Sequence, residues 1–344
     1  MSNFPSVSII IVNRNGMNFL KKCLDSILQL DYPPDKVKVI VFDNGSTDDS
    51  VNFIRNNYPR VMLMTSKINL GFAKANNLIY EKVNTKYVAL LNNDTYVHPK
   101  WLSEMVRCLE EDHSLGAVSS VYLPYNSSLS DRPIQELFEL FGQTLYRIVP
   151  ARTYTLFPYG ASCLIRNGIF RKLFEDFYFF SREDHYLGYM LWGSGKKILC
   201  TDKSIVWHYG GGSARRVPSS LIYYLNERNS LLNALIFQSK RLLVTLVPIL
   251  CLERTLMFFY YLVTRNKVAL GSMINAWLYC YKHKNDIRKK RKIIIPENVY
   301  INLFLSEPLR FKGPSKMVEL IRNKVFLKIY KIYFSLIWFI LRKS

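Results

Sequence analysis

The sequence has no paired cysteines, no internal repeats and no low-complexity segments. Its six cysteines are scattered along 344 residues without a Cys-x-x-Cys pair, which excludes the usual spacings of zinc clusters and redox motifs. We therefore expect most of them to be buried thiols in a reducing cytosol. The first residues run directly into a predicted strand without a basic and then apolar leader, so we expect no secretory signal.

Acidic residues are scarce in the carboxyl-terminal part of the chain. Residues 201–344 hold 25 basic and 7 acidic side chains, a balance of +18, whereas residues 1–200 hold 22 and 19, a balance of +3; together they give the net charge of +21. The first part has the composition of an ordinary soluble domain and is long enough to bury a core. The second part is suited to contact something anionic.

What the first part does contain is an alternation of strands and helices. Runs of β-branched and other apolar residues predict strands at 7–12, 37–42, 61–64 and 87–91, and apolar residues recur at helical spacing between them. This alternation predicts an α/β fold with a mostly parallel, doubly wound sheet. In the turn after the second strand, Ser46 or Thr47 is expected to cap the helix that follows.

Each of these four strands is followed by a polar turn rich in asparagine and aspartate. Asn and Asp favour turns for local reasons, which could explain any single turn. Four such turns in succession favour a nucleotide site, because the carboxyl ends of parallel strands meet at the edge where open α/β sheets bind ligands. The turn residues are Asn13, Arg14, Asp43, Asn44, Asn69, Asn92 and Asp94.

The fourth strand ends most abruptly, passing from Leu91 into Asn92, Asn93 and Asp94. A carboxylate at this position suits a hard divalent cation that holds a nucleotide diphosphate. The alternative is that Asp94 caps a helix after the strand. A second acidic pair, Glu183 and Asp184, is predicted at a helix start, where the helix dipole favours ionised carboxylates.

Each candidate functional feature between residues 181 and 216 also has a purely structural explanation. Glu183 and Asp184 could serve only as helix-capping residues, with Ser181 as the N-cap. His208 lies between two aromatic residues and before three glycines that allow the backbone to approach a ligand closely, although a single histidine is usually structural. Arg215 and Arg216 could neutralise a pyrophosphate or belong to a solvated basic loop.

The carboxyl-terminal tail combines apolar runs with positive charge. The runs at 242–251 and 256–263 approach the roughly 20 residues that cross a bilayer, but Glu253 and Arg254 lie between them and Pro248 interrupts the first. We therefore expect helices that lie at a membrane interface or pack on the first domain, rather than a true span. The basic block at 288–292 and the aromatic segment 325–341 indicate an anionic membrane surface. A nucleic-acid patch is the alternative for the basic block.

Several of these motifs occur together, in order and at characteristic separations. The set resembles the family-two inverting glycosyltransferases of the GT-A fold, especially their rhamnosyltransferase-like branch, over about residues 5 to 235. An aromatic helix with Arg228 and Asn229 is also similar to that branch. The motifs that carry the resemblance are Val7–Gly16, Asp43–Asp48, Asn69–Phe72, Leu91–Asp94, Glu183–Asp184 and Trp207–His208.

The resemblance implies a GT-A catalytic domain, a doubly wound mixed sheet, over residues 1–235 and a helical, membrane-associating extension over 236–344. It also implies a nucleotide-sugar site. Asp94 matches the last acid of the DxD signature and would bind Mg²⁺ or Mn²⁺ on the diphosphate, with His208 completing the site. Asn92 replaces the first acid, which predicts a modest metal affinity. The residues implied to bind the nucleotide sugar are Val12, Asn13, Arg14, Asp43, Asn44, Asn69, Asn92 and Asn93.

The resemblance further implies a hexosyltransferase in which Asp184 is the catalytic base and Glu183 orients the acceptor. Tyr186 stands where the family often has another acid, which puts the details of the acceptor in doubt. The QxxRW signature of processive synthases is missing, which favours transfer of one or a few sugars in cell-envelope polysaccharide biosynthesis. The implied donor is a UDP-, dTDP- or GDP-linked sugar. The implied acceptor is a glycan or polyprenyl-linked glycan at the cytoplasmic face of the membrane, without nucleic acid.

Two other functions share parts of this pattern. A sugar nucleotidyltransferase also has a doubly wound sheet, but it usually needs a glycine-rich basic loop after the first strand, and the segment 13–16 is a poor one. A catalytically inactive membrane or nucleic-acid adaptor could retain the fold. The intact acidic residues Asp94, Glu183 and Asp184 argue against such a loss of activity.

Overall fold

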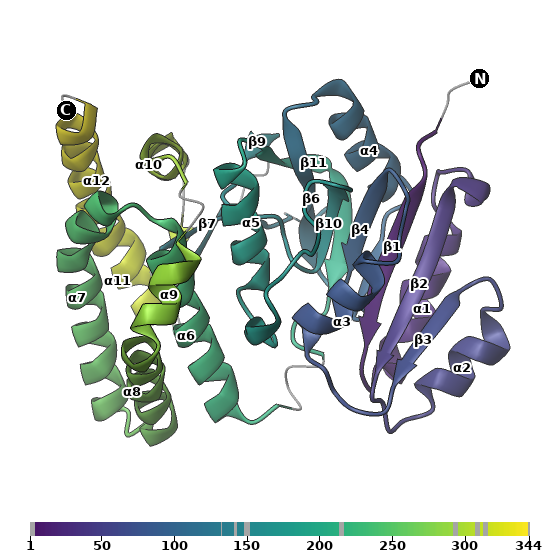
Figure 1. The fold of residues 1–344 in the computed structure, drawn as a ribbon, viewed down its shortest axis with the longest axis horizontal. Coiled ribbons are helices and arrows are strands. Elements are labelled where there is room, and N and C mark those ends of the chain that lie inside the picture. The colour runs from purple at the N-terminus through teal and green to yellow at the C-terminus, as the bar shows by residue number, and fades with distance from the viewer. Residues whose placement is uncertain are drawn as a thin grey trace.

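The computed structural model describes residues 4–131, 133–140, 143–147, 152–212, 217–291, 295–306, 310–311 and 316–342. Within them, a nine-stranded mixed sheet carries helices on both faces, and a helical region follows (Figure 1). The strand order is β3-β2-β1-β4-β10-β6-β11-β5, with β9 paired to β11. The strands are β1 (Val7–Asn13), β2 (Val37–Asn44), β3 (Met62–Ser66), β4 (Tyr87–Leu91), β5 (Thr95–Val97), β6 (Leu115–Pro124), β9 (Thr153–Tyr154), β10 (Ser162–Arg166) and β11 (Lys197–His208).

A second sheet of three strands lies beside the first and has the order β12-β8-β7. Its strands are β7 (Gln135–Leu140), β8 (Gln143–Arg147) and β12 (Arg310–Phe311). The helices are α1 (Met17–Leu28), α2 (Ser50–Asn57), α3 (Phe72–Tyr80), α4 (Trp101–Glu111), α5 (Glu183–Gly193), α6 (Ser219–Phe237), α7 (Lys240–Val263), α8 (Lys267–Lys282), α9 (Lys284–Lys290), α10 (Glu297–Ser306), α11 (Lys316–Ile321) and α12 (Leu327–Arg342).

The first half of the main sheet is parallel, as the sequence predicts. Strand β1 pairs in parallel with β2 and β4, and β2 pairs in parallel with β3. The second half is mixed, because β10 runs antiparallel to both β4 and β6. In register, Asn13 lies opposite Asp43, and Asp43 lies opposite Thr65. The polar turns that follow the first strands are therefore brought to one edge.

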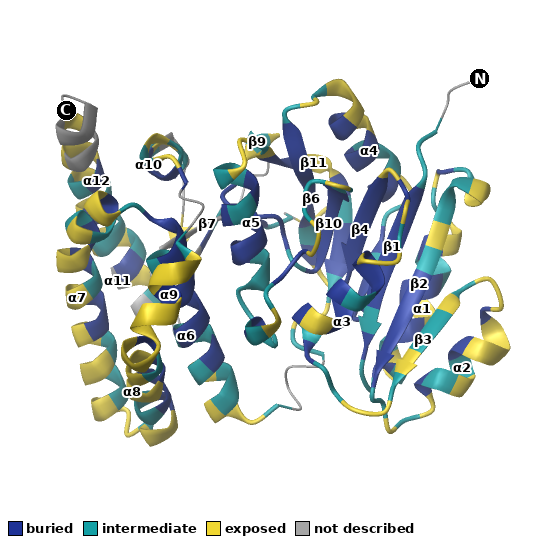
Figure 2. Ribbon diagram, in the orientation of Figure 1, coloured by how far each residue is buried: buried dark blue, intermediate teal, exposed yellow. Residues whose placement is uncertain are grey.

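The core fills both faces of this sheet. Alternate residues of a strand point to opposite faces, and in β1 Ile10 packs into one apolar cluster while Ile9 and Ile11 pack into the other. Every residue of β4 is buried, and the dark central strands in Figure 2 show the same burial. Five of the six cysteines are buried thiols, as expected, and Cys251 is exposed.

Two predicted helix caps are wrong. Helix α2 begins at Ser50 without a side-chain cap, because the hydroxyl of Ser46 donates instead to Asp43 Oδ2 over 2.5 Å. Helix α5 begins after Arg182, also without a side-chain cap, because the hydroxyl of Ser181 donates to Asn226 on α6 over 2.6 Å. In both places a tertiary contact takes the hydroxyl that the local pattern assigned to a helix end.

The prediction that Pro248 interrupts the first apolar run is wrong, because α7 continues through this residue. A stripe of buried residues, Leu242, Leu246 and Ile249, runs past the proline, and burial of this stripe stabilises the helix across the missing hydrogen bond. By length and composition alone, α7 could cross a membrane.

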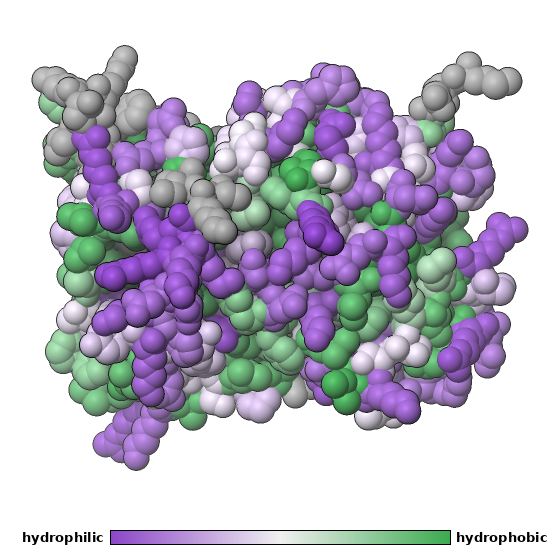
Figure 3. Space-filling view, in the orientation of Figure 1, coloured by the Kyte–Doolittle hydropathy of each residue, from purple (hydrophilic) through white to green (hydrophobic). Residues whose placement is uncertain are grey.

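The charged residues in the middle of α7 face the protein. Arg254 Nη1 lies 2.9 Å from Glu227 Oε2 on α6, and Arg322 Nη2 lies 3.2 Å from Glu253 Oε1. The opposite side of α7 is exposed and apolar, with Val244 71% and Val263 81% exposed. Figure 3 shows such apolar surface at the helical end of the molecule, next to strongly hydrophilic side chains. The helix is therefore amphipathic, and its central charges, Glu253 and Arg254, form ion pairs within the protein.

Candidate active site

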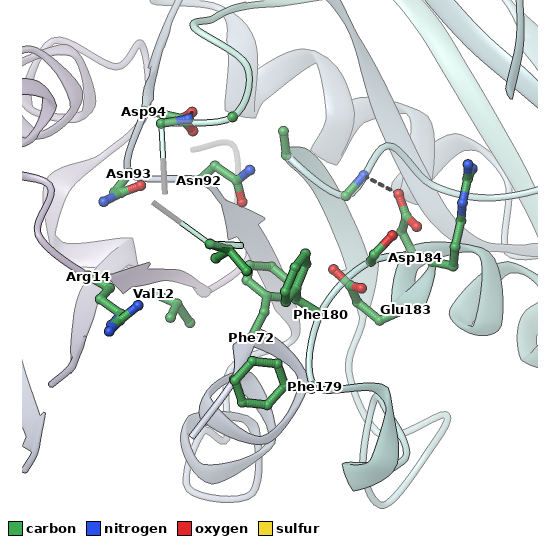
Figure 4. A pocket seen from close by; sticks show the side chains of 18 of the residues that line it. Val12, Arg14, Phe72, Asn92, Asn93, Asp94, Phe179, Phe180, Glu183 and Asp184 are labelled. Carbon is green, nitrogen blue, oxygen red and sulfur yellow. Dashed lines mark hydrogen bonds between the residues drawn. The ribbon is translucent and has the colours of Figure 1, made fainter. Parts of the chain in front are cut away.

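A cavity of about 450 Å³ lies at the edge where the strand ends meet. It separates the turns after β1, β2 and β4 from the start of α5, so that Asn93 and Asp94 lie on one side and Glu183 and Asp184 on the other (Figure 4). The two acidic motifs, 89 positions apart at Asp94 and Glu183, thus share one cavity. The predicted residues that line it are Val12, Arg14, Asn44, Asn69, Asn92, Asn93, Asp94, Glu183, Asp184 and His208.

Asn13 and Asp43, which were also predicted to bind the nucleotide, lie behind the cavity wall. Asn13 Nδ2 donates to Asp43 Oδ2 over 3.0 Å, and Asn93 Nδ2 donates to Asn13 Oδ1 over 2.7 Å. The packing is tight, because a Cβ on Gly16 would lie 2.1 Å from Asn93 Nδ2. These buried bonds fix the positions of the neighbouring residues that do face the cavity.

Asn44 and Asn69 form a second bonded pair in the wall. Asn44 Nδ2 donates to Asn69 Oδ1 over 3.0 Å, and Asn44 Oδ1 accepts from the backbone of Leu70 over 2.8 Å. Gly71 follows with a φ of +82°, and a Cβ there would lie 2.6 Å from Phe179. Glycine is needed at this turn, which closes against the loop that leads to Glu183.

The pairing of β5 with β11 brings Asp94 and His208 together. Thr95 lies opposite His208 in this antiparallel pair. Asp94 therefore immediately precedes a strand and does not cap a helix. Asp94 Oδ1 lies 3.2 Å from His208 Nε2, and Asp94 Oδ2 accepts from the N–H of Gly212 over 2.9 Å. His208 Nδ1 is hydrogen-bonded to the hydroxyl of Tyr159 over 2.6 Å.

This pair has the chemistry of a divalent-cation site. Burial acts to raise the pKa of Asp94, but His208 and the N–H of Gly212 outweigh it and hold the pKa below its ordinary value, so Asp94 is a carboxylate at neutral pH. His208 Nε2 is buried and faces Asp94 Oδ1, so these two atoms are suited to share one metal ion. Over the residues that the structure describes, no group of three or more His, Cys, Asp or Glu side chains could hold a metal. Asp94 and His208 are thus a candidate pair of ligands.

Asp184 lies at the opposite end of the cavity, in the first turn of α5. Its carboxylate accepts from the backbone N–H of Gly160 over 3.3 Å and of His185 over 2.9 Å; the first of these bonds is drawn in Figure 4. A Cβ on Gly160 would lie 2.8 Å from Asp184 Oδ2. The glycine therefore allows the backbone before β10 to approach and orient this carboxylate.

The environment of Glu183 favours its protonated form. Burial, with a further contribution from the charge of Asp184, raises the pKa of Glu183 to about 8. Its Oε2 atom is buried without a hydrogen-bond partner. At neutral pH Glu183 is therefore protonated and able to donate a hydrogen bond.

Glu183→Gln is expected to flatten the pH dependence of thermal stability. Between the ordinary value of 4.5 and the raised pKa of about 8, the folded wild type binds more protons than the unfolded chain, so its stability falls as the pH rises through that window. A glutamine has no such proton to lose. Melting temperatures measured across the window should decline more steeply for wild type than for the variant, and for the exposed control Glu81→Gln the slope should match wild type. Equal slopes for all three proteins would contradict the assignment.

Helix α6 holds the loop before α5 in an unusual conformation. Phe179, Ser181 and Arg182 have positive φ values of 48°, 72° and 64°. Asn229 Nδ2 donates to the carbonyls of Phe180 and Ser181 over 3.1 and 2.6 Å, and Asn233 Nδ2 donates to that of Arg182 over 3.2 Å. These bonds stabilise backbone that would otherwise be strained, and they position Glu183 and Asp184.

Some functional residues were missed at the sequence level. Tyr159, which contacts His208, was not singled out as a candidate site residue. Asn233 could have been found, because asparagines at 226, 229 and 233 repeat at helical spacing within an apolar helix. Glu136 also lines the cavity, and no local pattern pointed to it. Arg215 and Arg216 lie outside the described residues.

Comparison with solved structures places this fold in the GT-A class of glycosyltransferases, as predicted. The chain is similar to the mannosyltransferase PcManGT of Pyrobaculum calidifontis in complex with GDP-mannose and Mn²⁺, with 17% identity, a TM-score of 0.50 and coverage of 97% of this chain and 85% of the other. It is also similar to residues 1–349 of TarS from Staphylococcus aureus in complex with UDP-GlcNAc, with 16% identity, a TM-score of 0.50 and coverage of 88% and 80%. At these identities the likeness shows the fold alone.

The sequence comparison gives the family. Residues 8–174 match the model of glycosyl transferase family 2, so this segment belongs to that family, and the family prediction is confirmed. An uncharacterized glycosyltransferase of Haemophilus influenzae is 28% identical over 123 residues, which is 35% of this chain. The match spans 38% of that relative's length. The rhamnosyltransferase-like branch stays a prediction.

Proposed function

We propose that this protein is an inverting, metal-dependent glycosyltransferase of the hexosyl-transferring type. It moves a sugar from a nucleotide diphosphate to a hydroxyl of a glycan or lipid-linked glycan. The observation that carries the proposal is that Asp94 and Asp184 line opposite sides of one cavity. A cation-binding carboxylate and a proton-accepting carboxylate on either side of a bound substrate suit displacement at a carbon between them.

The donor would bind with its nucleoside against the walls formed by the first two strand ends. Val12, Asn44 and Asn69 line that part of the cavity. Arg14 Nε is buried without a hydrogen-bond partner, so it can donate to an oxygen of the base or ribose. The similar structures hold GDP-mannose and UDP-GlcNAc, which supports a UDP-, dTDP- or GDP-linked sugar as the donor class.

Asp94 and His208 would hold Mg²⁺ or Mn²⁺, and the donor's diphosphate would complete the ligand set, as is common where one or two protein groups bind such a cation. When bound, the cation neutralises charge that develops on the leaving diphosphate. Tyr159 orients the imidazole: when His208 Nδ1–H donates to the Tyr159 hydroxyl oxygen, the lone pair of Nε2 faces Asp94. The Mn²⁺ bound in the similar structure of PcManGT supports a divalent ion.

The chemical step follows from the opposite end of the cavity. Asp184 accepts the proton of an acceptor hydroxyl as its oxygen attacks the anomeric carbon from the face opposite the leaving diphosphate. One displacement inverts the anomeric configuration. Glu183, protonated at neutral pH, donates a hydrogen bond that orients the acceptor beside Asp184.

A panel of UDP-, dTDP- and GDP-linked sugars, tested with and without Mn²⁺, examines this proposal. We expect tight, Mn²⁺-dependent binding of at least one donor by calorimetry, and slow hydrolysis of that donor. Binding without hydrolysis or transfer would indicate an inactive adaptor. Formation of a nucleotide sugar from a nucleoside triphosphate and a sugar phosphate would indicate a nucleotidyltransferase.

We also propose that the helical extension over 236–344 attaches the catalytic domain over 1–235 to the cytoplasmic face of the membrane. The exposed apolar side of α7 and the basic helix α9 support this placement. Apolar side chains would enter the interface while lysines and arginines contact anionic headgroups. An acceptor carried on a polyprenyl lipid would be accessible from the same surface.

The full chain is expected to sediment with vesicles that contain phosphatidylglycerol at low salt, and to be partly released at high salt. Each basic residue near an anionic surface contributes about 1 kcal/mol, and salt screens that attraction. Replacing Phe259 and Val263, both exposed, by serine should weaken binding without changing the charge. Recovery of the wild type wholly in the soluble fraction at low salt would contradict the placement.

A further inference from the structure

Glu136 is a third carboxylate of the cavity, and it comes from outside the main sheet. It lies on β7, which begins after Ile134 forms a bridge to Tyr122 at the end of β6. Gln135 is fully buried, and because successive side chains of a strand alternate, Glu136 points the other way, into the cavity. The hydroxyl of Tyr122 donates to Glu136 Oε1 over 3.4 Å.

The surroundings of Glu136 place it at the acceptor end of the cavity. Asp184 lies close enough to act on it electrostatically, and the Arg182 guanidinium acts in the opposite sense. Burial, followed by Asp184, raises the pKa of Glu136. Glu136 makes no ion pair with any residue in the described part of the chain. An acidic side chain in such a place costs stability, which points to a functional role.

Its position relative to the metal end is fixed by stacked rings. Tyr122, which bonds to Glu136, stacks on Tyr159 with ring centroids 4.8 Å apart and planes 9° apart. Tyr159 in turn is hydrogen-bonded to His208. A ligand that contacts Glu136 is thereby placed at a defined distance from the pair that would hold the diphosphate.

We propose that Glu136 binds a hydroxyl of the acceptor sugar next to the hydroxyl that Asp184 deprotonates. The inference rests on the proposed glycosyltransferase function and identifies a residue that determines acceptor specificity. A diphosphate is disfavoured at this end because the carboxyl groups of Glu136 and Asp184 both line it. A sugar hydroxyl is neutral and donates to the free carboxyl oxygen. Because a site built to bind a hydroxyl rejects an analogue that lacks it, Glu136 selects which hydroxyl faces the base.

The test uses the full chain with Mn²⁺, the donor found in the nucleotide-sugar panel, and octyl glycosides of glucose, galactose, mannose, rhamnose and N-acetylglucosamine as acceptors. Glu136→Ala is expected to lower kcat/KM for the acceptor by roughly ten- to a hundred-fold, the value of a hydrogen bond to a charged group. The donor's Kd and the rate of donor hydrolysis should stay within about two-fold of wild type. Glu136→Gln should recover part of the loss. The exposed control Glu81→Gln should match wild type.

Deoxy forms of the best acceptor locate the contact. One deoxy acceptor should lose activity with wild type but lose nothing further with Glu136→Ala, because the same hydrogen bond is removed twice. Additive losses for every deoxy acceptor, unchanged acceptor kinetics, weakened donor binding, or donor hydrolysis without transfer to any glycoside would overturn this inference alone. Absence of donor binding by the wild type would overturn the proposed function and the inference with it. Melting temperatures would reveal whether Glu136→Ala is misfolded. In that case the acceptor kinetics of Glu136→Gln are used instead.

Discussion

Asp184→Asn is expected to lower kcat by roughly 10²- to 10⁴-fold, the usual contribution of a positioned general base. The asparagine keeps the shape of the side chain, and its one amide oxygen can still accept from the N–H of either Gly160 or His185. Asn229 and Asn233 continue to hold the loop, which should remain in place. The substituted side chain has no basic oxygen to take the acceptor's proton. Binding of the nucleoside diphosphate with Mn²⁺ should stay close to wild type, because Asp184 lies at the far end of the cavity from Asp94.

Single-turnover kinetics and calorimetry on the same protein separate these two effects. Asp202→Asn is a matched control, since it removes one negative charge from an exposed side chain outside the cavity. Near-wild-type turnover by Asp184→Asn would remove Asp184 from the role of base. Parallel loss of turnover and nucleotide binding would instead indicate that the cavity had collapsed.

Asp94→Ala is expected to weaken Mn²⁺-dependent donor binding by at least the roughly 10- to 100-fold that loss of an outer partner of a metal site costs. Among the described residues that line the cavity, Asp94 provides the one carboxylate on its side, because Asn92 and Asn93 are neutral. Its removal leaves His208 as the remaining protein ligand. Nucleoside binding without metal should change little, because Asn44 and Asn69 are unaffected.

Titrations of UDP and GDP with increasing Mn²⁺ measure this change, with Asp94→Asn as the variant that preserves shape. The Asn variant should resemble the Ala variant in metal dependence, because the charge rather than the volume is lost. Asp202→Ala should bind as wild type does. An unchanged metal requirement in both Asp94 variants would assign the cation to other groups.

The predictable part of the site was the part encoded by strand ends. Parallel pairing brings equivalent turn positions to one edge, so the polar residues that end β1, β2 and β4 could be grouped from sequence. The sequence could not show which of these residues face the cavity. Asn13 and Asp43 bond to each other behind the wall, and only the register of β1 with β2 determines that outcome.

Contacts between distant segments account for what was missed or wrong. Ser181 looked like a helix cap, but Asn226 on α6 takes its hydroxyl. Glu136 reaches the cavity from a separate sheet whose strands pair β7 with β8 and β8 with β12, and no short-range pattern encodes that arrangement. In the tail, Glu253 and Arg254 pair with side chains of other elements, and the burial that carries α7 through Pro248 likewise depends on its packing partners.

The asparagines of α6 have a mechanical consequence. Helix α6 is hydrogen-bonded to the strained loop before α5 on one side and contacts α8 and α9 on the other. It ends at Phe237, close to the proposed domain boundary at residue 235. With the extension attached to a bilayer as proposed, α6 would connect that attachment directly to the loop that positions Asp184. Turnover is then expected to depend on how the helical extension is oriented at the bilayer.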